Sequence, residues 1–236
     1  MADKKVVTEP EEVNEVVEKA KGFWDKYSKK IIAVSLIVIV VGGGWLAYKN
    51  LYVIPNEEKA ADIIFPAEKL FAKMTQTGFD KDSINQVLNG DKSSANVGLL
   101  SIIKKYGGTS AGNRARYMAG VCYLYSKDFS NAVKYLKEFS TDATQVQTVA
   151  YLLLGDANAE LKKNDEALDY YKKAAALNTK DEFMTPEALY KAAMFAEVSG
   201  KSNDAIELYK NIKDNYPKSA HLNDVEKALA KLGASN

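Results

Sequence analysis

The stretch from Ile31 to Tyr48 constrains the fold most, because it contains 18 residues without one charge. A helix rises about 1.5 Å per residue, so about 20 residues cover the roughly 30 Å apolar core of a bilayer. The apolar run continues to Ile54 with a single charge, at Lys49, whose long side chain can reach the interface. The sequence therefore predicts one transmembrane helix over residues 31–54.

The lysines that flank this run predict its orientation. Five of them lie just before the run and two just after it: Lys19, Lys21, Lys26, Lys29 and Lys30, then Lys49 and Lys59. Basic residues stay on the cytoplasmic side. No small-residue cleavage site follows the run, which favours an uncleaved signal anchor. We expect a cytoplasmic N-terminus and a translocated C-terminal part.

Residues 1–30 predict a cytoplasmic amphipathic segment. Thr8 is placed to cap a helix whose apolar side chains recur at helical spacing, namely Val13, Val16, Val17, Phe23 and Trp24. Such a stripe needs a covering surface. Two interpretations remain open: the helix lies on the inner surface of the lipid bilayer, or it packs on a cytoplasmic protein.

After the anchor, residues 55–79 predict a membrane-proximal helix. Pro66 lies inside its apolar pattern, so a kink or a break is expected there. Residues 80–236 then repeat a unit made of one helix, a short polar turn and a second helix that opens with alanine. These alanines are Ala132, Ala167 and Ala205.

The repeat resembles the tetratricopeptide repeat, whose period is about 34 residues and whose paired helices cross at small residues. Matching positions are Gly120, Tyr123, Phe129 and Ala132; Leu154, Gly155, Ala167, Tyr171 and Ala174; and Ala193, Gly200, Ala205, Tyr209 and Pro217. A fainter copy contains Ala95 and Gly107, and residues 222–232 predict a capping helix. The fold class expected is all-α: one transmembrane helix, then a tetratricopeptide-like solenoid of antiparallel helix pairs.

Composition argues against several functions. From Pro55 onward the chain carries 24 basic and 24 acidic residues, so the domain offers no electrostatic footprint for nucleic acid. One cysteine, Cys122, excludes an internal disulfide, and with His221 as the only histidine the usual metal-ligand clusters cannot form. No catalytic motif is found. We expect no cofactor, no metal and no enzymatic activity.

The combination of one uncleaved anchor and external repeats resembles the YfgM-like family of membrane-anchored tetratricopeptide proteins, and the stretch YGGTSAGNRARYMAGVCYL resembles small anchored proteins of Bacteroidota. The resemblance implies a bacterial inner membrane protein with a periplasmic repeat domain. It implies a non-enzymatic adaptor whose partners are Sec translocon subunits, a periplasmic prolyl isomerase or chaperone, and nascent secretory chains. The alternative function is a scaffold for cell-envelope or division complexes.

The resemblance to the tetratricopeptide repeat implies a partner-binding groove on the first helix of each pair. The implied positions are Arg114, Tyr117, Val121, Leu124, Val149, Leu152, Asp156, Tyr190, Met194 and Glu197. The mixture of apolar, aromatic and charged side chains suits an extended peptide or the helix of another protein. Packing of these residues on one another, or on the helix at residues 56–74, is the competing interpretation.

Overall fold

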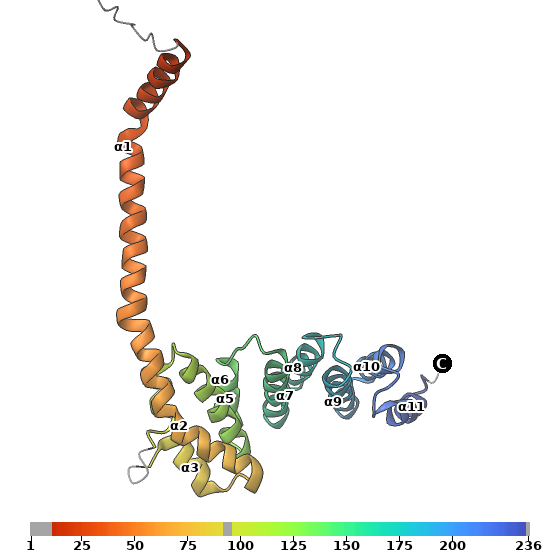
Figure 1. Cartoon of the computed structure of the whole chain (residues 1–236). Coiled ribbons are helices and arrows are strands. Elements are labelled where there is room, and N and C mark those ends of the chain that lie inside the picture. The colour runs from red at the N-terminus through yellow and green to blue at the C-terminus, as the bar shows by residue number, and fades with distance from the viewer. Residues whose placement is uncertain (1–10, 92–95, 235–236) are drawn as a thin grey trace, which may run out of the picture. The chain divides into compact units, whose positions relative to one another are not determined.

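The computed structural model describes residues 11–91 and 96–234 (Figure 1). Across these two ranges the chain is helical, and its only extended pairing is an isolated bridge between Asp91 and Asn96. It divides into two compact units, Met1–Pro55 and Asn56–Asn236. The expectations for Thr8, Ala95 and the side chain of Val13 lie outside what the structure describes.

The first unit consists mainly of α1, Glu11–Tyr48, which is followed by η1, a π-helical turn at Lys49–Val53. α1 is long and apolar enough to cross a membrane by length and composition. Tyr27 and Tyr48 stand 21 positions apart in the chain, which corresponds to about 31 Å along a helix, close to the thickness of the apolar bilayer core. Aromatic residues at that spacing suit the two membrane interfaces.

Most of the long helix α2, Ile54–Thr77, belongs to the second unit, and the helix runs through Pro66 without a break. Of the two outcomes expected at this proline, the break is therefore ruled out. Ala60, Ile64 and Ala67 of α2 are buried in one cluster with α3 (Lys81–Asn89), α4 (Leu99–Tyr106) and α5 (Ser110–Tyr125). The side chain of Asp80 caps α3 by accepting hydrogen bonds from the backbone N–H groups of Asp82 and Ser83.

Three helix pairs follow, and each consists of a longer first helix and a second helix that packs against it (Figure 1). The pairs are α5 (Ser110–Tyr125) with α6 (Phe129–Lys137), α7 (Thr144–Glu160) with α8 (Asn164–Ala176), and α9 (Met184–Val198) with α10 (Ser202–Asn215). α7 contacts both α5 and α9, so the first helices are neighbours. This arrangement confirms the predicted solenoid of helix pairs.

Small residues let the paired helices approach closely, as the repeat pattern predicts. A Cβ atom added to Gly120 would lie 2.5 Å from Cγ of Leu136, and one added to Gly155 would lie 2.3 Å from Cε1 of Tyr171. Both distances are far shorter than van der Waals contact. The α5–α6 and α7–α8 crossings therefore depend on glycine.

The turns between paired helices share one backbone geometry. The residues after the first helices, Lys127, Lys162 and Gly200, have φ of 61°, 61° and 78°. In each turn the next backbone N–H reaches back five residues, as from Asp128 to the carbonyl oxygen of Tyr123, which is a Schellman motif. Gly233 closes the predicted capping helix α11, Leu222–Lys231, in the same way. The C-terminal end of α11 therefore has the same geometry as the ends of the first helices α5, α7 and α9.

Candidate binding face on the first helices

The exposed side of α9 lies opposite its buried side. Ala188, Ala192 and Ala196 are fully buried against neighbouring helices. Met194 is 47% exposed and Val198 is 81% exposed, and they lie on the other side of the helix. We call the outward sides of α5, α7 and α9 the first-helix face.

On α7 the corresponding positions are Val146, Val149, Leu152 and Asp156. Val146 is 41% exposed, whereas the other three are half-buried. Leu152 packs against the core cluster that α8, α9 and α10 form. On the α7 portion of the face, Val146 is therefore the exposed apolar side chain.

On α5 the structure gives the four expected residues different surroundings. Val121 is 6% exposed and Leu124 packs into the cluster between α6 and α7, so both serve the core. The ring of Tyr117 lies 5.1 Å from that of Phe139, and burial raises the pKa of its hydroxyl. Arg114 is exposed, and its Nε donates to Oε1 of Glu68 on α2 at 2.8 Å. The residues on the α5 portion of the face therefore already make contacts with other parts of the same chain.

Asp156 links two successive repeats. Its Oδ1 accepts a hydrogen bond from the hydroxyl of Tyr171 at 2.6 Å, and its Oδ2 accepts one from Nζ of Lys191 at 2.8 Å. Tyr171 lies on α8 and Lys191 on α9, so one carboxylate on α7 joins three helices. Burial, and then the nearby negative charge of Asp156, raise the pKa of Tyr171 and keep its hydroxyl a proton donor.

The face at α9 contacts α10 and α11 through two further carboxylates. Glu197 accepts hydrogen bonds from Nζ of Lys231 at 2.6 Å and from the hydroxyl of Tyr209 at 3.2 Å, and the Lys231 bond lowers the Glu197 pKa. Nε2 of His221 lies 2.6 Å from Oε2 of Glu187. The imidazole stacks on Tyr190 with ring centroids 4.1 Å apart. Tyr190 is thus covered on one ring face.

These contacts determine what the first-helix face offers a ligand. Its charged residues Arg114, Asp156, Glu187 and Glu197 each have a partner within the chain. The exposed apolar side chains of the face need no ion-pair or hydrogen-bond partner. The arrangement suits apolar anchors of another protein inside a polar rim.

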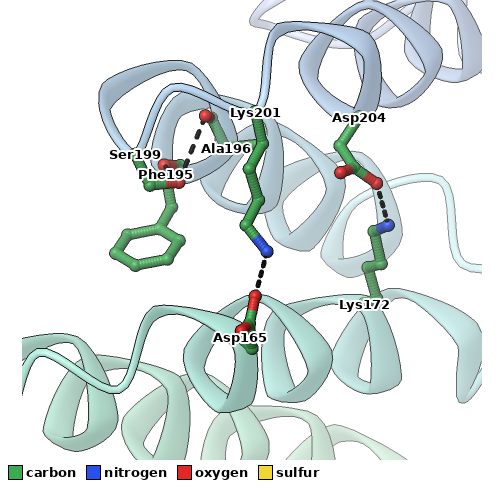
Figure 2. A network of polar contacts seen from close by, with 7 residues as sticks. All are labelled: Asp165, Lys172, Phe195, Ala196, Ser199, Lys201 and Asp204. Carbon is green, nitrogen blue, oxygen red and sulfur yellow. Dashed lines mark hydrogen bonds and ion pairs between the residues drawn. The ribbon is translucent and has the colours of Figure 1, made fainter.

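Polar contacts also tie together the second helices of the last two repeats. Figure 2 shows Lys201 paired with Asp165, and Lys172 of α8 paired with Asp204 of α10. Ser199 donates to the carbonyl oxygens of Phe195 and Ala196 at the end of α9. Beside Lys172 a hollow of about 560 Å³ opens between α8, α9 and α10.

Sequence reasoning missed two exposed features of this unit. Val198 is the most exposed apolar residue of α9, and Phe183 is 87% exposed in the connection between α8 and α9. The sequence does mark that connection, because the third repeat is spaced three residues wider than the second. It does not show which way the ring of Phe183 points.

In the part of the chain that the structure describes, no three His, Cys, Asp or Glu side chains come together in a way that would hold a metal ion. Cys122 is fully buried in α5, and burial raises the pKa of its thiol to about 12. A thiol in that setting is a poor nucleophile, because the thiolate is the reactive form.

The side chains expected to make a cytoplasmic contact lie on the exterior of α1. Val16 is 67% exposed, Val17 44%, Phe23 57% and Trp24 54%. The ring of Phe23 lies 5.0 Å from that of Tyr27. This part of α1 therefore presents apolar surface that no other described residue of the first unit covers.

Comparison with known proteins identifies the family. A family model described as "Tetratricopeptide repeat-like domain" matches residues 21–234. No curated protein matches the chain. Among solved structures, a crystal structure of MamA protein matches at 20% identity with a TM-score of 0.52, covering 74% of this chain and 85% of that chain. A second MamA crystal structure matches at 23% identity with a TM-score of 0.47, covering 66% of this chain and 86% of that chain. The chain belongs to the tetratricopeptide repeat-like domain family.

Proposed function

We propose that this protein is a non-enzymatic, membrane-anchored scaffold that holds another protein on its first-helix face. Solenoids of this kind bind ligands along the surface that their stacked repeats create. The observation that carries the proposal is the exposure of Val146, Met194 and Val198 on α7 and α9, beside carboxylates that are already paired. Partner contacts at this face also include Arg114, Tyr190 and the half-buried Val149.

The proposed location is a bacterial inner membrane, with residues 31–54 spanning the bilayer. The N-terminus is cytoplasmic and the repeats are periplasmic. The lysine-rich flank before Ile31 supports this orientation, and the length of α1 supports the span.

The proposed partners are subunits of the Sec translocon, a periplasmic prolyl isomerase or chaperone, and nascent secretory chains. The resemblance to YfgM-like anchored proteins supports this choice. The chemistry of the face is compatible with it, because a chaperone helix or an unfolded chain supplies apolar side chains.

The test is co-purification from detergent extracts with variants that place a charge on the face. Met194→Glu and Val198→Glu should each reduce capture of the partner about tenfold, because burying an unpaired charge at an interface is costly. Val97→Glu is the matched control, since Val97 is 43% exposed and lies before α4, outside the helices α5, α7 and α9 that form the face.

Unchanged capture by both face variants would contradict the proposed binding surface. The captured proteins also identify the function. Translocon subunits or a prolyl isomerase would support the export function, whereas wall-synthesis or division proteins alone would replace it with an envelope scaffold.

A further inference from the structure

The apolar residues in the cytoplasmic part of α1 follow a seven-residue repeat, and the same register continues through apolar positions of the uncharged run to the end of the helix. Starting at Val17, apolar side chains recur at alternating steps of three and four. The positions are Val17, Ala20, Trp24, Tyr27, Ile31, Val34, Val38, Val41, Trp45 and Tyr48. We call this line the seam. It ends where α1 gives way to the π-helical turn at Lys49.

We propose that the seam pairs two copies of this chain in a parallel, in-register coiled coil that runs from the cytoplasmic segment into the membrane. An apolar residue every 3.5 positions is what a left-handed pair of helices requires, and membrane helices commonly pack with the same crossing angle. The inference rests on the proposed membrane anchor. It assigns a second copy of this chain as the partner of α1, a partner that the proposed function leaves open.

Charge placement in the cytoplasmic part supports a second copy. Of the ten charged residues between positions 11 and 30, eight fall on the side of the helix away from the seam. The other two, Lys21 and Lys30, flank the seam. In a parallel pair, Lys21 of one copy faces Val16 of the other, and Lys30 faces Ser35. No like charges therefore meet across the proposed interface.

Small residues line one edge of the seam at the same period. Ser28, Ser35 and Gly42 lie seven positions apart, each directly after a seam residue. A Cβ atom added at Gly42 would meet nothing within 4 Å in the single chain. Small side chains at such positions let two membrane helices approach closely.

A lipid surface fits the cytoplasmic segment less well. Residues 11–30 contain five acidic and five basic side chains, with four glutamates in the first eight positions. Helices that lie on membranes carry a lysine- or arginine-rich polar face, and the inner leaflet repels acids. α1 is a single helix that bends between its N-terminal part and the longer straight part that follows, as Figure 1 shows. A helix of a different protein would need the same repeat in both its cytoplasmic part and its membrane part. A second copy of this chain has that repeat by symmetry.

The test is disulfide crosslinking of the full chain in isolated membranes, in a Cys122→Ala background. Val17→Cys and Trp24→Cys lie on the seam, and their neighbours Glu18→Cys and Asp25→Cys are the matched controls. The seam variants should form crosslinked dimers at least tenfold more than the controls. Because one heptad spans about 10 Å along a helix, co-expressed Val17→Cys and Trp24→Cys chains should form few mixed disulfides.

Equal yields at seam and control positions, or no crosslinks at either, would overturn the proposal. Disulfides to a protein of another mass would overturn it in favour of a different partner, and abundant mixed disulfides would exclude an in-register pair. As a second variant, Trp24→Glu should abolish crosslinking at Val17→Cys, whereas Asp25→Ala should not. The readout is independent of partner capture by the repeats, so dimerisation and the scaffold function can fail separately.

Discussion

Gly155 lies where α7 and α8 cross, and its missing side chain leaves room for the ring of Tyr171. Gly155→Ala should lower the free energy of unfolding by about 1–3 kcal/mol, because the added methyl group overpacks this crossing. Gly108→Ala is the control, since nothing lies within 4 Å of a Cβ atom there. Thermal unfolding of the purified protein measures both. Equal stability of the two variants would contradict the crossing.

The left-handed residue in each turn gives a matched pair of predictions. Lys162 and Gly200 occupy equivalent positions with φ of 61° and 78°. Lys162→Gly should stabilise the protein by about 0.5–1 kcal/mol, and Gly200→Lys should destabilise it by a similar amount, because only glycine adopts this conformation without strain. Denaturant unfolding of the two variants should therefore shift in opposite directions. A shift of the same sign in both would be inconsistent with the turn geometry.

Cys122 reports on the opening of α5. Its thiol is buried, and its pKa is raised from 9.0 to about 12 by desolvation. The associated stability is complete below pH 9, the ordinary value, and is lost as the pH rises toward 12. Native protein at pH 8 should be alkylated by iodoacetamide at least a hundredfold more slowly than urea-unfolded protein. Similar rates in the two states would show that the thiol is accessible.

At the scale of the elements, polar contacts between helices differ in strength. The hydroxyl of the buried Tyr171 donates to Asp156, whereas the ion pair between Lys172 and Asp204 is partly exposed. Tyr171→Phe should cost about 1 kcal/mol, and Asp204→Asn at most about 0.5 kcal/mol. Chemical denaturation of the two variants gives the comparison. A larger loss for Asp204→Asn would reverse our ranking of these contacts.

The sequence predicted the helix pairs because their signal is local and repeated. Gly120, Gly155 and Ala193, with the alanine that opens each second helix, fix where two helices approach. The same periodicity places the first helices side by side. It also separates buried alanines from exposed positions such as Met194.

Sequence reasoning missed the polar contacts between repeats, although they leave a trace. Asp156 with Lys191, Glu187 with His221, and Glu197 with Lys231 join residues 34 or 35 positions apart, which is one repeat length. Opposite charges at that separation are common by chance, so the pattern alone does not identify them. The burial of Val121, which is 6% exposed, was also missed.

In the whole molecule, one long apolar helix precedes a solenoid of helix pairs. α1 offers its seam and the repeats offer their first-helix face. The two surfaces belong to separate compact units. Each therefore has its own partner and its own test, and the proposed function depends on both the anchor and the face.

The most direct test of the central claim is site-specific photo-crosslinking in intact cells, followed by mass spectrometry. Probes replace Met194 on the first-helix face and Lys210, which is exposed on α10. The account predicts that the Met194 probe captures a distinct protein, a translocon subunit, a periplasmic prolyl isomerase or a nascent secretory chain, and that the Lys210 probe does not. Capture at Met194 no stronger than at Lys210 would contradict the first-helix face as the binding surface.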